Sequence, residues 1–464
     1  MERVNPATGE ALESMESDGE TGIEDALATS EEAFESWRDV PLGEREELLA
    51  NAADVLRENS EEYAEVMTEE MGKPIAAARS EVEKCAWVCE YYAEHASEHL
   101  QDERIGTEPG VDSFVSYEPL GPILAVMPWN FPFWQVFRFA APHLTSGNVG
   151  LLKHASNVPG CAEAIEEVFH EAGYPDGVFQ TLLVGSDAVD DIIEDDRLKA
   201  VTLTGSEPAG RAVAETAGAQ IKKTVLELGG SDPFVVLDDA DVEAAAATGA
   251  RARTINSGQS CIAAKRFIVV EDVYDEFVEA FVEEMNALTV GDPRDDVDLG
   301  PQAREDLLAD LHDQVERSVE AGATVELGGE PLDRDGFFYP PTVLTDVPRD
   351  AAVATEEVFG PVAPIFEVAG EAEAIALTND TDLGLGGSVW TEGRERGKRV
   401  AREIESGAVF VNELTKSDPR LPFGGIGDSG YGRELGEMGI HEFVNRKTVW
   451  VQDAEMPEDE PAGE

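Results

Sequence analysis

One cysteine and one glutamate have the types and surroundings needed for covalent catalysis. Cys261 ends the segment Asn256-Ser257-Gly258-Gln259-Ser260-Cys261, and Glu227 precedes Leu228-Gly229-Gly230. A cysteine attacks as its thiolate, of which a few per cent is present at neutral pH when the pKa is unperturbed. A carboxylate that takes a proton, directly or through water, completes such a mechanism. Taken alone, Cys261 is equally consistent with a buried structural cysteine.

The two segments belong to an ordered series of motifs. In chain order the others are Pro128-Trp129-Asn130-Phe131-Pro132, Lys153, Gly205-Ser206-Glu207-Pro208-Ala209-Gly210, Glu357-Val358-Phe359-Gly360-Pro361 and Pro422-Phe423-Gly424-Gly425. From Asn5 to about Trp450, the chain resembles the NAD(P)-dependent aldehyde dehydrogenase superfamily. The resemblance implies an oxidoreductase with two Rossmann-related α/β domains and a small β oligomerisation element.

The resemblance also assigns the catalytic roles. Cys261 is the expected nucleophile, and Glu227 is the base that activates water to release the acid from a thioester. The Asn130 amide and the Cys261 backbone N–H form the expected oxyanion hole, in which one donor is worth about 10²–10³ in rate. Asn130 as a plain turn residue is the alternative. This chemistry needs no metal, and Cys85 with Cys89 lacks the further ligands of a closed zinc site.

The expected cofactor site begins where a strand over 200–204 leads into a helix. Free N–H groups at such a helix start favour phosphate. The spacing differs from G-x-G-x-x-G, so an ordinary strand–turn–helix junction is the alternative. By resemblance, the cofactor-binding residues are Trp129, Lys153, Ser156, Gly205, Ser206, Leu228, Glu357 and Phe359. Trp129 as a core aromatic and Lys153 as a surface lysine remain open.

Position 156 bears on the choice between NAD and NADP. Many NAD-preferring members of the superfamily carry Glu there, which binds the ribose hydroxyls and repels a 2′-phosphate. This chain has Ser156, close to Lys153. A hydroxyl beside a lysine leaves room and positive charge for a 2′-phosphate. We therefore expect NADP to be accepted, alongside NAD.

Arg138 is the expected substrate residue. It lies eight residues after Asn130, just over two helical turns, so the two side chains share one side of the expected helix. A guanidinium there can bind the far carboxylate of an ω-oxo acid, and this arginine resembles the short succinate-semialdehyde dehydrogenase branch. Better-known members carry a second arginine at the position of Ile255. Two alternatives stay open: Arg138 pairs with an acidic neighbour, or the enzyme oxidises glutarate semialdehyde and aliphatic aldehydes broadly.

Two other functional classes fit the sequence less well. A catalytically silent member of the fold would lack the nucleophile or the base, and both Cys261 and Glu227 are present. Members that pass the acyl group to coenzyme A usually lack the glutamate at position 227. We therefore expect hydrolysis to the free acid.

The elements that position these residues follow from apolar periodicity. Helical spacing predicts helices within 21–104, and from Ile123 strands and helices alternate, with strands over 123–127, 149–153, 179–184 and 200–204. A second alternating block starts near Phe234, with its clearest strands over 266–270 and 408–411. We expect an NAD(P)-binding domain over 1–227, a catalytic domain over 228–415, a return and oligomerisation segment over 416–452 and a disordered acidic tail over 453–464.

The oligomerisation element combines a hairpin near 106–120 with a strand near Lys447–Val451. By resemblance its exposed edges pair with a neighbouring subunit, which predicts a homodimer or homotetramer.

The charge is extreme, with 34 basic and 97 acidic residues and a net charge of −63. Nucleic acid and anionic membranes are poor partners for such a surface. The acids are scattered, as in proteins of salt-accumulating (halophilic) cells, and 42% hydrophobic content excludes a disordered acidic protein. No apolar run is long enough to span a membrane and the N-terminus is acidic, so we expect a cytoplasmic protein.

Overall fold

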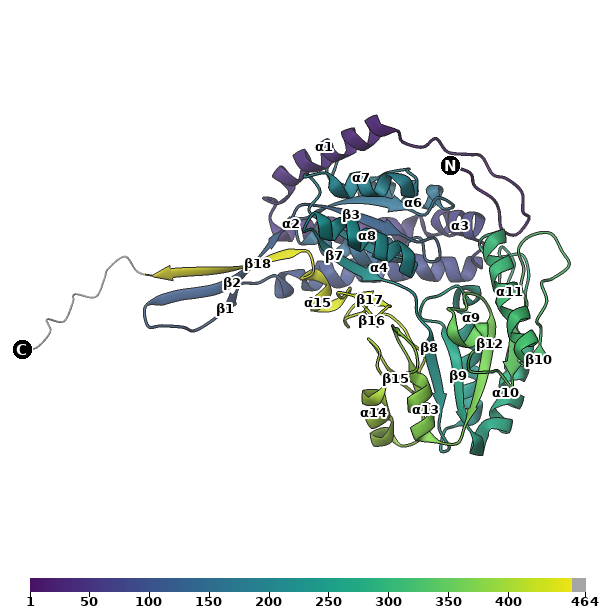
Figure 1. Ribbon diagram of the computed structural model, residues 1–464. Helices are drawn as coiled ribbons and strands as arrows, with labels where there is room; N and C mark the ends of the chain where they lie inside the picture. The colour runs from purple at the N-terminus through teal and green to yellow at the C-terminus, as the bar shows by residue number, and fades with distance from the viewer. Residues whose placement is uncertain (453–464) are drawn as a thin grey trace, which may run out of the picture.

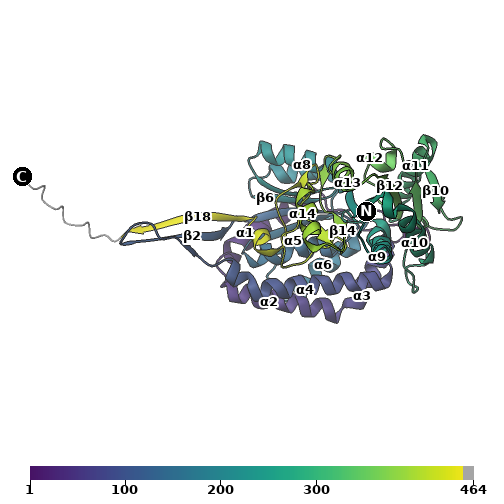
Figure 2. The same cartoon turned by 90° about the horizontal axis from the view of Figure 1, so that it is seen from below.

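The computed structural model describes residues 1–452; the expected disordered tail lies outside the described residues. The chain begins with the predicted helices, α1 (Glu20–Trp37), α2 (Leu42–Glu58), α3 (Ser60–Met71) and α4 (Ile75–His99). Helix α2 buries Leu49, Ala52, Ala53 and Leu56, which recur at helical spacing, against the core. Figure 2 shows α2, α3 and α4 side by side along one face of the molecule.

The first large sheet has six strands in the order β17-β7-β6-β3-β4-β5. Five are parallel, and β17 pairs antiparallel with β7. Near-continuous burial of β3 is typical of a parallel strand covered on both faces. The strands are β3 (Pro122–Met127), β4 (Val149–His154), β5 (Phe179–Thr181), β6 (Ala200–Thr204), β7 (Lys223–Glu227) and β17 (Gly430–Tyr431); the helices are α5 (Trp134–Thr145), α6 (Pro159–Glu171), α7 (Val189–Glu194) and α8 (Glu207–Ala219).

The prediction of a strand over 179–184 is wrong at its end. Leu182 N still donates to Leu152 O, but Val184 N bonds back to Leu182 O, so the chain turns away from β4.

The second large sheet has seven strands in the order β10-β11-β12-β9-β8-β14-β15. All neighbours are parallel except β10 and β11. The strands are β8 (Asp232–Val236), β9 (Ala264–Val270), β10 (Thr324–Leu327), β11 (Thr342–Thr345), β12 (Val362–Val368), β14 (Ser388–Trp390) and β15 (Phe410–Val411). The helices of this half are α9 (Val242–Thr254), α10 (Tyr274–Ala287), α11 (Glu305–Ala321), α12 (Ala352–Thr355), α13 (Glu371–Thr378) and α14 (Arg394–Glu403).

The two sheets meet at the ends of their strands. Strand β7 ends at Glu227 and β8 begins at Asp232, so residues 228–231 cross from one sheet to the other (Figure 1). The carboxyl ends of β3, β6 and β7 in the first sheet therefore face the amino ends of β8, β9 and β12 in the second. In the first sheet the strand order reverses between β3 and β6, and ligands bind beside such switch points.

An arm formed by the three-stranded sheet β1-β2-β18 projects from the body in both views (Figures 1 and 2). Strand β2 (Val111–Pro119) pairs antiparallel with β18 (Val444–Gln452) along its full length, and β1 (Glu103–Arg104) pairs with part of β2. The expected hairpin and C-terminal strand thus form one sheet. Near its tip, Trp450 and Val451 are about half exposed.

The remaining elements are short. They are β13 (Leu383–Gly384), β16 (Ile426–Gly427), α15 (Gly436–Ile440) and single 3₁₀ turns at Ser186–Ala188, Ile255–Gly258 and Glu271–Val273. Among the helices of the described part, none is long and apolar enough to cross a bilayer.

Candidate active site

The loop before Cys261 has an unusual backbone that several contacts hold in place. Asn256 and Ser257 have φ of 55° and 57°, in the left-handed region that costs a non-glycine residue about 1–3 kcal/mol. The Asn256 side-chain amide donates to Asn130 O (2.6 Å) and Gln259 O (3.1 Å). A Cβ on Gly258 would lie 2.2 Å from the backbone carbon of Gly360, so only glycine fits there. These contacts fix the direction from which Cys261 is presented.

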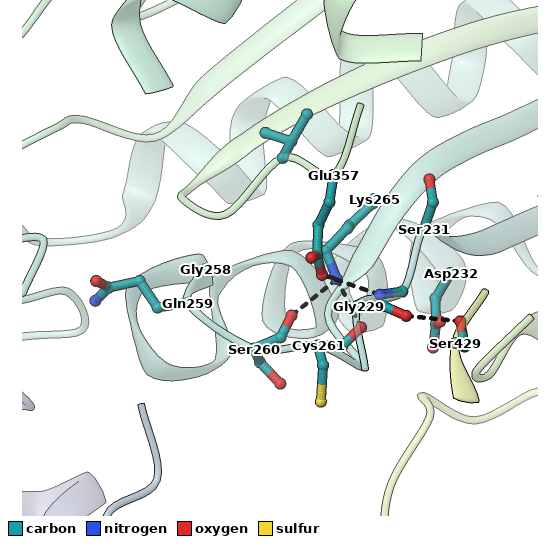
Figure 3. Close-up of polar contacts among 12 residues, drawn as sticks. Gly229, Ser231, Asp232, Gly258, Gln259, Ser260, Cys261, Lys265, Glu357 and Ser429 are labelled. Carbon is teal, nitrogen blue, oxygen red and sulfur yellow. Dashed lines mark hydrogen bonds and ion pairs between the residues drawn. The ribbon is translucent and has the colours of Figure 1, made fainter. Parts of the chain in front are cut away.

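Lys265 bonds to the backbone of the loop that carries Cys261, residues 256–261, which we call the nucleophile loop (Figure 3). Its ammonium donates to Ser260 O (2.9 Å) and Cys261 O (2.6 Å), and lies 3.2 Å from Glu357 Oε1. Figure 3 shows Cys261 Sγ pointing away from this ammonium. Burial raises the pKa of the Cys261 thiol to about 11, while the charges of Lys265 and Arg138 act to lower it.

Glu227 ends strand β7 with its carboxyl group buried. The residue is 2% exposed, and neither carboxyl oxygen has a hydrogen-bond partner among the described residues. Burial raises the pKa of Glu227 well above its ordinary value; Glu434 raises it further and Arg138 lowers it. A carboxyl group with both oxygens free and a raised pKa is suited to take a proton from water.

Asn130 follows strand β3 and contacts the nucleophile loop directly. Its side-chain amide donates to Gln259 O over 3.1 Å. Asn130 and Cys261 line one pocket, of about 180 Å³. The amide therefore lies beside the expected nucleophile, in the region where an oxyanion donor would be needed.

This pocket, which we call the cofactor pocket, gathers most of the predicted site. Its lining residues are Pro128, Trp129, Asn130, Gln135, Thr204, Gly205, Ser206, Leu228, Gly229, Cys261, Glu357 and Phe359. The rings of Trp129 and Phe359 meet edge to face with centroids 5.7 Å apart. Trp129 thus lies at the pocket wall.

The pocket suits a dinucleotide. Helix α8 starts directly after Ser206, so its first N–H groups face the turn that lines the pocket. Glu357 Oε1 accepts from Gly230 N over 3.0 Å. A Cβ on Gly229 would lie 2.6 Å from Glu357 Oε2, so glycine keeps this carboxylate accessible.

Lys153 and Ser156 lie outside that lining, at the end of the neighbouring strand β4. Lys153 is 7% exposed, and burial lowers its pKa, opposed by the charge of Asp187. Among the described residues, no carboxylate lies within ion-pair distance of its ammonium. Ser156 is exposed.

Arg138 forms the pair with an acidic residue that the sequence left open as the alternative to a substrate role. It is 2% exposed, and its Nε forms an ion pair with the buried Glu434. Its Nη2 donates to Thr204 Oγ1 over 3.3 Å, and Cζ lies 4.7 Å from the Phe423 ring centroid. Because Thr204 lines the cofactor pocket, one edge of the guanidinium reaches the wall around Cys261 while the other pairs with Glu434.

Two residues of the site were missed in the sequence. Lys265 lies four positions after Cys261 and would have stood out only as a lysine in a lysine-poor chain. Glu434 lies in Gly432-Arg433-Glu434-Leu435-Gly436, close after the Phe423 motif, but nothing local indicates its partner.

Residues 1–449 match the aldehyde dehydrogenase family. The chain belongs to this family. Among curated aldehyde dehydrogenases, the probable succinate-semialdehyde dehydrogenase [NADP(+)] of Synechocystis sp. is 55% identical, covering 97% of this chain and 99% of the relative. Succinate-semialdehyde dehydrogenase [NADP(+)] 1 of Mycobacterium tuberculosis is 51% identical, with 97% and 99% covered. Succinic semialdehyde dehydrogenase from Streptococcus pyogenes, solved in complex with NADP+, superposes with a TM-score of 0.95 at 39% identity, covering 97% of this chain and 100% of that one.

Proposed function

We propose that this enzyme oxidises succinate semialdehyde to succinate with NADP+, and also with NAD+. The observation that carries the substrate assignment is Arg138, whose Nη2 reaches Thr204 in the wall of the pocket that holds Cys261. Relatives more than 50% identical over nearly their whole length bear the same substrate in their names.

In the first half of the reaction, formation of the thioester, Cys261 and Asn130 act. The Cys261 thiolate adds to the aldehyde carbon, and the resulting alkoxide accepts hydrogen bonds from the Asn130 amide and the Cys261 backbone N–H. A nicotinamide bound in the cofactor pocket supplies a hydride acceptor for this carbon. The product on the enzyme is a Cys261 thioester.

The second half belongs to Glu227. Its carboxylate takes a proton from water, and the hydroxide adds to the thioester carbon. Collapse of the second tetrahedral species breaks the carbon–sulfur bond, releases the acid and regenerates the Cys261 thiolate. Since Glu227 has no hydrogen-bond partner among the described residues, a water molecule meets no competitor for its oxygens.

Cofactor selection rests on Lys153 and Ser156. Lys153 is a buried ammonium with no carboxylate within ion-pair distance in the described part, so it is free to meet a 2′-phosphate. Ser156 presents a hydroxyl where a carboxylate would repel that phosphate. Glu357, held by Gly230 N, is suited to the nicotinamide ribose.

The wider organisation is also proposed. Residues 1–227 bind the cofactor, 228–415 carry the nucleophile, and 416–452 complete the first sheet and the arm. The arm presents apolar side chains such as Trp450 and Val451, which suit pairing with a second copy. The net charge of −63 suits a salt-rich cytoplasm, where short Debye lengths screen self-repulsion.

Initial rates over an aldehyde panel, with NADP+ and NAD+ in molar KCl, test the proposal. We expect kcat/KM for succinate semialdehyde to exceed that for propanal at least about tenfold, and Arg138→Ala to remove that lead, as loss of a charged hydrogen-bond partner does. A flat panel, with Arg138→Ala changing all substrates alike, would instead identify a broad-specificity aldehyde dehydrogenase.

A further inference from the structure

We propose that the buried ion pair of Lys73 and Glu81 positions the Asn130 amide, so that the hairpin of α3 and α4 contributes to formation of the thioester. Neither Lys73 nor Glu81 lines the cofactor pocket, so both are positioning residues that act through Asn130. The oxyanion role of Asn130 belongs to the proposed function, on which this inference rests.

Helix α5, which begins at Trp134, four residues after Asn130, has no capping side chain of its own. Its N-cap residue is Phe133, and no side chain of the cap bonds to the helix. The side chains that usually cap a helix are those of Ser, Thr, Asp and Asn. Because the first N–H groups of a helix have no partner within it, the local sequence leaves the start of α5 unsupported.

Glu81 of α4 supplies the missing cap from 52 positions upstream of Phe133. Its Oε1 accepts from Phe133 N over 3.0 Å and from Trp134 N over 2.9 Å. The residue is buried, and a carboxylate at a helix N-terminus also interacts favourably with the helix dipole. Since these two N–H groups follow Asn130 by three and four positions, Glu81 determines where the backbone leaves Asn130.

Lys73 holds this carboxylate and contacts the same segment. Its buried ammonium pairs with Glu81 Oε2 and lies 4.0 Å from the ring centroid of Phe131, a cation–π contact. Phe131 directly follows Asn130 in the chain. A buried ion pair is often no more stabilising than well-packed apolar side chains. The contribution of this pair therefore lies in the contacts that it makes on both sides of Pro132.

The nucleophile loop is held by a different set of contacts. Gly300 N donates to Ser257 Oγ over 3.0 Å, and Ala303 N donates to Gln259 Oε1 over 2.8 Å. Neither contact involves a side chain of the ion pair. Removing the pair should therefore displace the Asn130 amide and leave the direction of the Cys261 thiol unchanged.

The same hairpin carries a second buried carboxylate that provides a matched control. Glu70 of α3 accepts from Gly160 N over 2.8 Å and from Cys161 N over 2.9 Å, at the start of α6, and pairs with Arg3 over 2.6 Å. Among the described residues that line the cofactor pocket, none comes from α6. The two pairs thus have the same chemistry, and only one of them reaches the Asn130 segment.

The test measures the single-turnover rate of cofactor reduction after rapid mixing of excess enzyme, saturating NADP+ and succinate semialdehyde. The double variant Lys73→Met with Glu81→Leu removes the pair without leaving a lone buried charge. We expect it to slow reduction about tenfold to a hundredfold, since a displacement of about 1 Å can cost about 10²-fold. The control, Arg3→Met with Glu70→Leu, should stay within about twofold, because its contacts share no partner with the first pair.

Two milder variants separate the acceptor from the charge. Lys73→Met with Glu81→Gln returns an oxygen acceptor to the start of α5 and should recover most of the rate. Glu81→Asp keeps the charge on a side chain that is one carbon shorter, and should slow reduction about threefold or more. This single variant keeps the inference testable if the apolar double variant does not fold.

A double-mutant cycle shows whether the pair acts through Asn130. In an Asn130→Ala background, removal of the pair should slow reduction by less than about twofold further, because the amide that it positions is already absent. Alkylation of Cys261 by iodoacetamide develops no oxyanion. Its rate should therefore stay within about twofold of wild type in every variant of the pair.

The outcomes separate the two proposals. If Asn130→Ala does not slow reduction, the oxyanion role in the proposed function fails. If Asn130→Ala slows reduction and removal of the Lys73–Glu81 pair does not, that role stands and the positioning inference is wrong. Equal slowing on removal of either pair, or slowing that persists in the Asn130→Ala background, would show that Lys73 and Glu81 support the fold as a whole, which also overturns the inference.

Discussion

The Lys265 ammonium donates to the backbone oxygen of Cys261 over 2.6 Å and lies 3.2 Å from a carboxylate oxygen of Glu357. One buried cation therefore joins the segment that carries the nucleophile to the carboxylate proposed to hold the nicotinamide ribose. Both partners, the Cys261 backbone oxygen and the Glu357 carboxylate, are hydrogen-bond acceptors. Without the Lys265 ammonium no donor would lie between them.

Removing that cation should change the titration of the nucleophile. Because the charge of Lys265 lowers the pKa of the Cys261 thiol, Lys265→Met should raise it and slow alkylation by iodoacetamide at pH 7 about tenfold. The measurement is the alkylation rate between pH 6 and 10, with Lys398→Met as an exposed-lysine control. An unchanged pH profile in Lys265→Met would show that the lysine acts on the backbone alone.

Glu227→Gln should separate the two halves of the reaction. The first half does not use Glu227, so rapid mixing should give a burst of about one reduced cofactor per Cys261. Steady-state turnover should then fall by about 10²–10⁴, the usual contribution of a general base. Asn130→Ala should instead slow the burst itself, by about 10²–10³. Loss of the burst in Glu227→Gln would place this carboxyl in the first half.

In the pH profile of thioester hydrolysis, the Glu434→Gln substitution should shift the acidic limb to lower pH. Glu434 raises the pKa of Glu227 and Arg138 lowers it, so removing the Glu434 charge lowers that pKa on both counts. Since the base works deprotonated, hydrolysis of the thioester should persist at lower pH. Single-turnover rates from pH 5 to 9 measure this.

The matched control for that experiment is Glu442→Gln. Glu442 also raises the pKa of Glu227, but it is the last of the contributing causes, so its shift should be smaller and in the same direction. Leaving Arg138 without its partner should also destabilise Glu434→Gln, by about 3–5 kcal/mol. A limb that moves to higher pH would contradict the charge argument.

Salt should stabilise this protein. With a net charge of −63, self-repulsion dominates at low ionic strength, and the Debye length falls from about 10 Å at 0.1 M to 3 Å at 1 M. The melting temperature should therefore rise by about 5 °C or more between 0.1 and 2 M KCl, followed by calorimetry. Exposed ion pairs, such as those of Arg57 with Glu83 and Glu90, oppose this trend because salt weakens them. A falling melting temperature would show that they prevail.

The sequence predicts the elements with strong apolar patterns and the residues within local motifs. Helices α1 to α4 lie in the region predicted as helical, 21–104, for which the pattern gave no separate helix bounds, and strands β3, β4 and β6 begin and end within one residue of the expected positions. Asn130, Cys261 and the turn at Gly205 come together because each follows or precedes a strand at the same junction. The family resemblance predicts these positions, and the order of the strands gives the physical reason why they meet.

Partners distant in the chain could not be predicted. Arg138 has many possible acidic partners, and only folding selects Glu434. Glu81 and the Phe133 N–H that it accepts from are 52 positions apart, and neither lies in a motif. The short strands β13, β16 and β17 contain glycine, which has no strand propensity of its own, so only the pairing of distant segments creates them.

The arm also has a consequence for biosynthesis. Lys447 of β18 bonds to Glu118 of β2 across 329 positions of sequence. At about 5–20 residues per second, β2 waits roughly 16 to 66 seconds on the ribosome before its partner emerges. Throughout that interval most of one strand edge is open to any extended peptide nearby. The acidic residues along β2, including Asp112 and Glu118, oppose its pairing with other strands, so they protect the nascent polypeptide from aggregation.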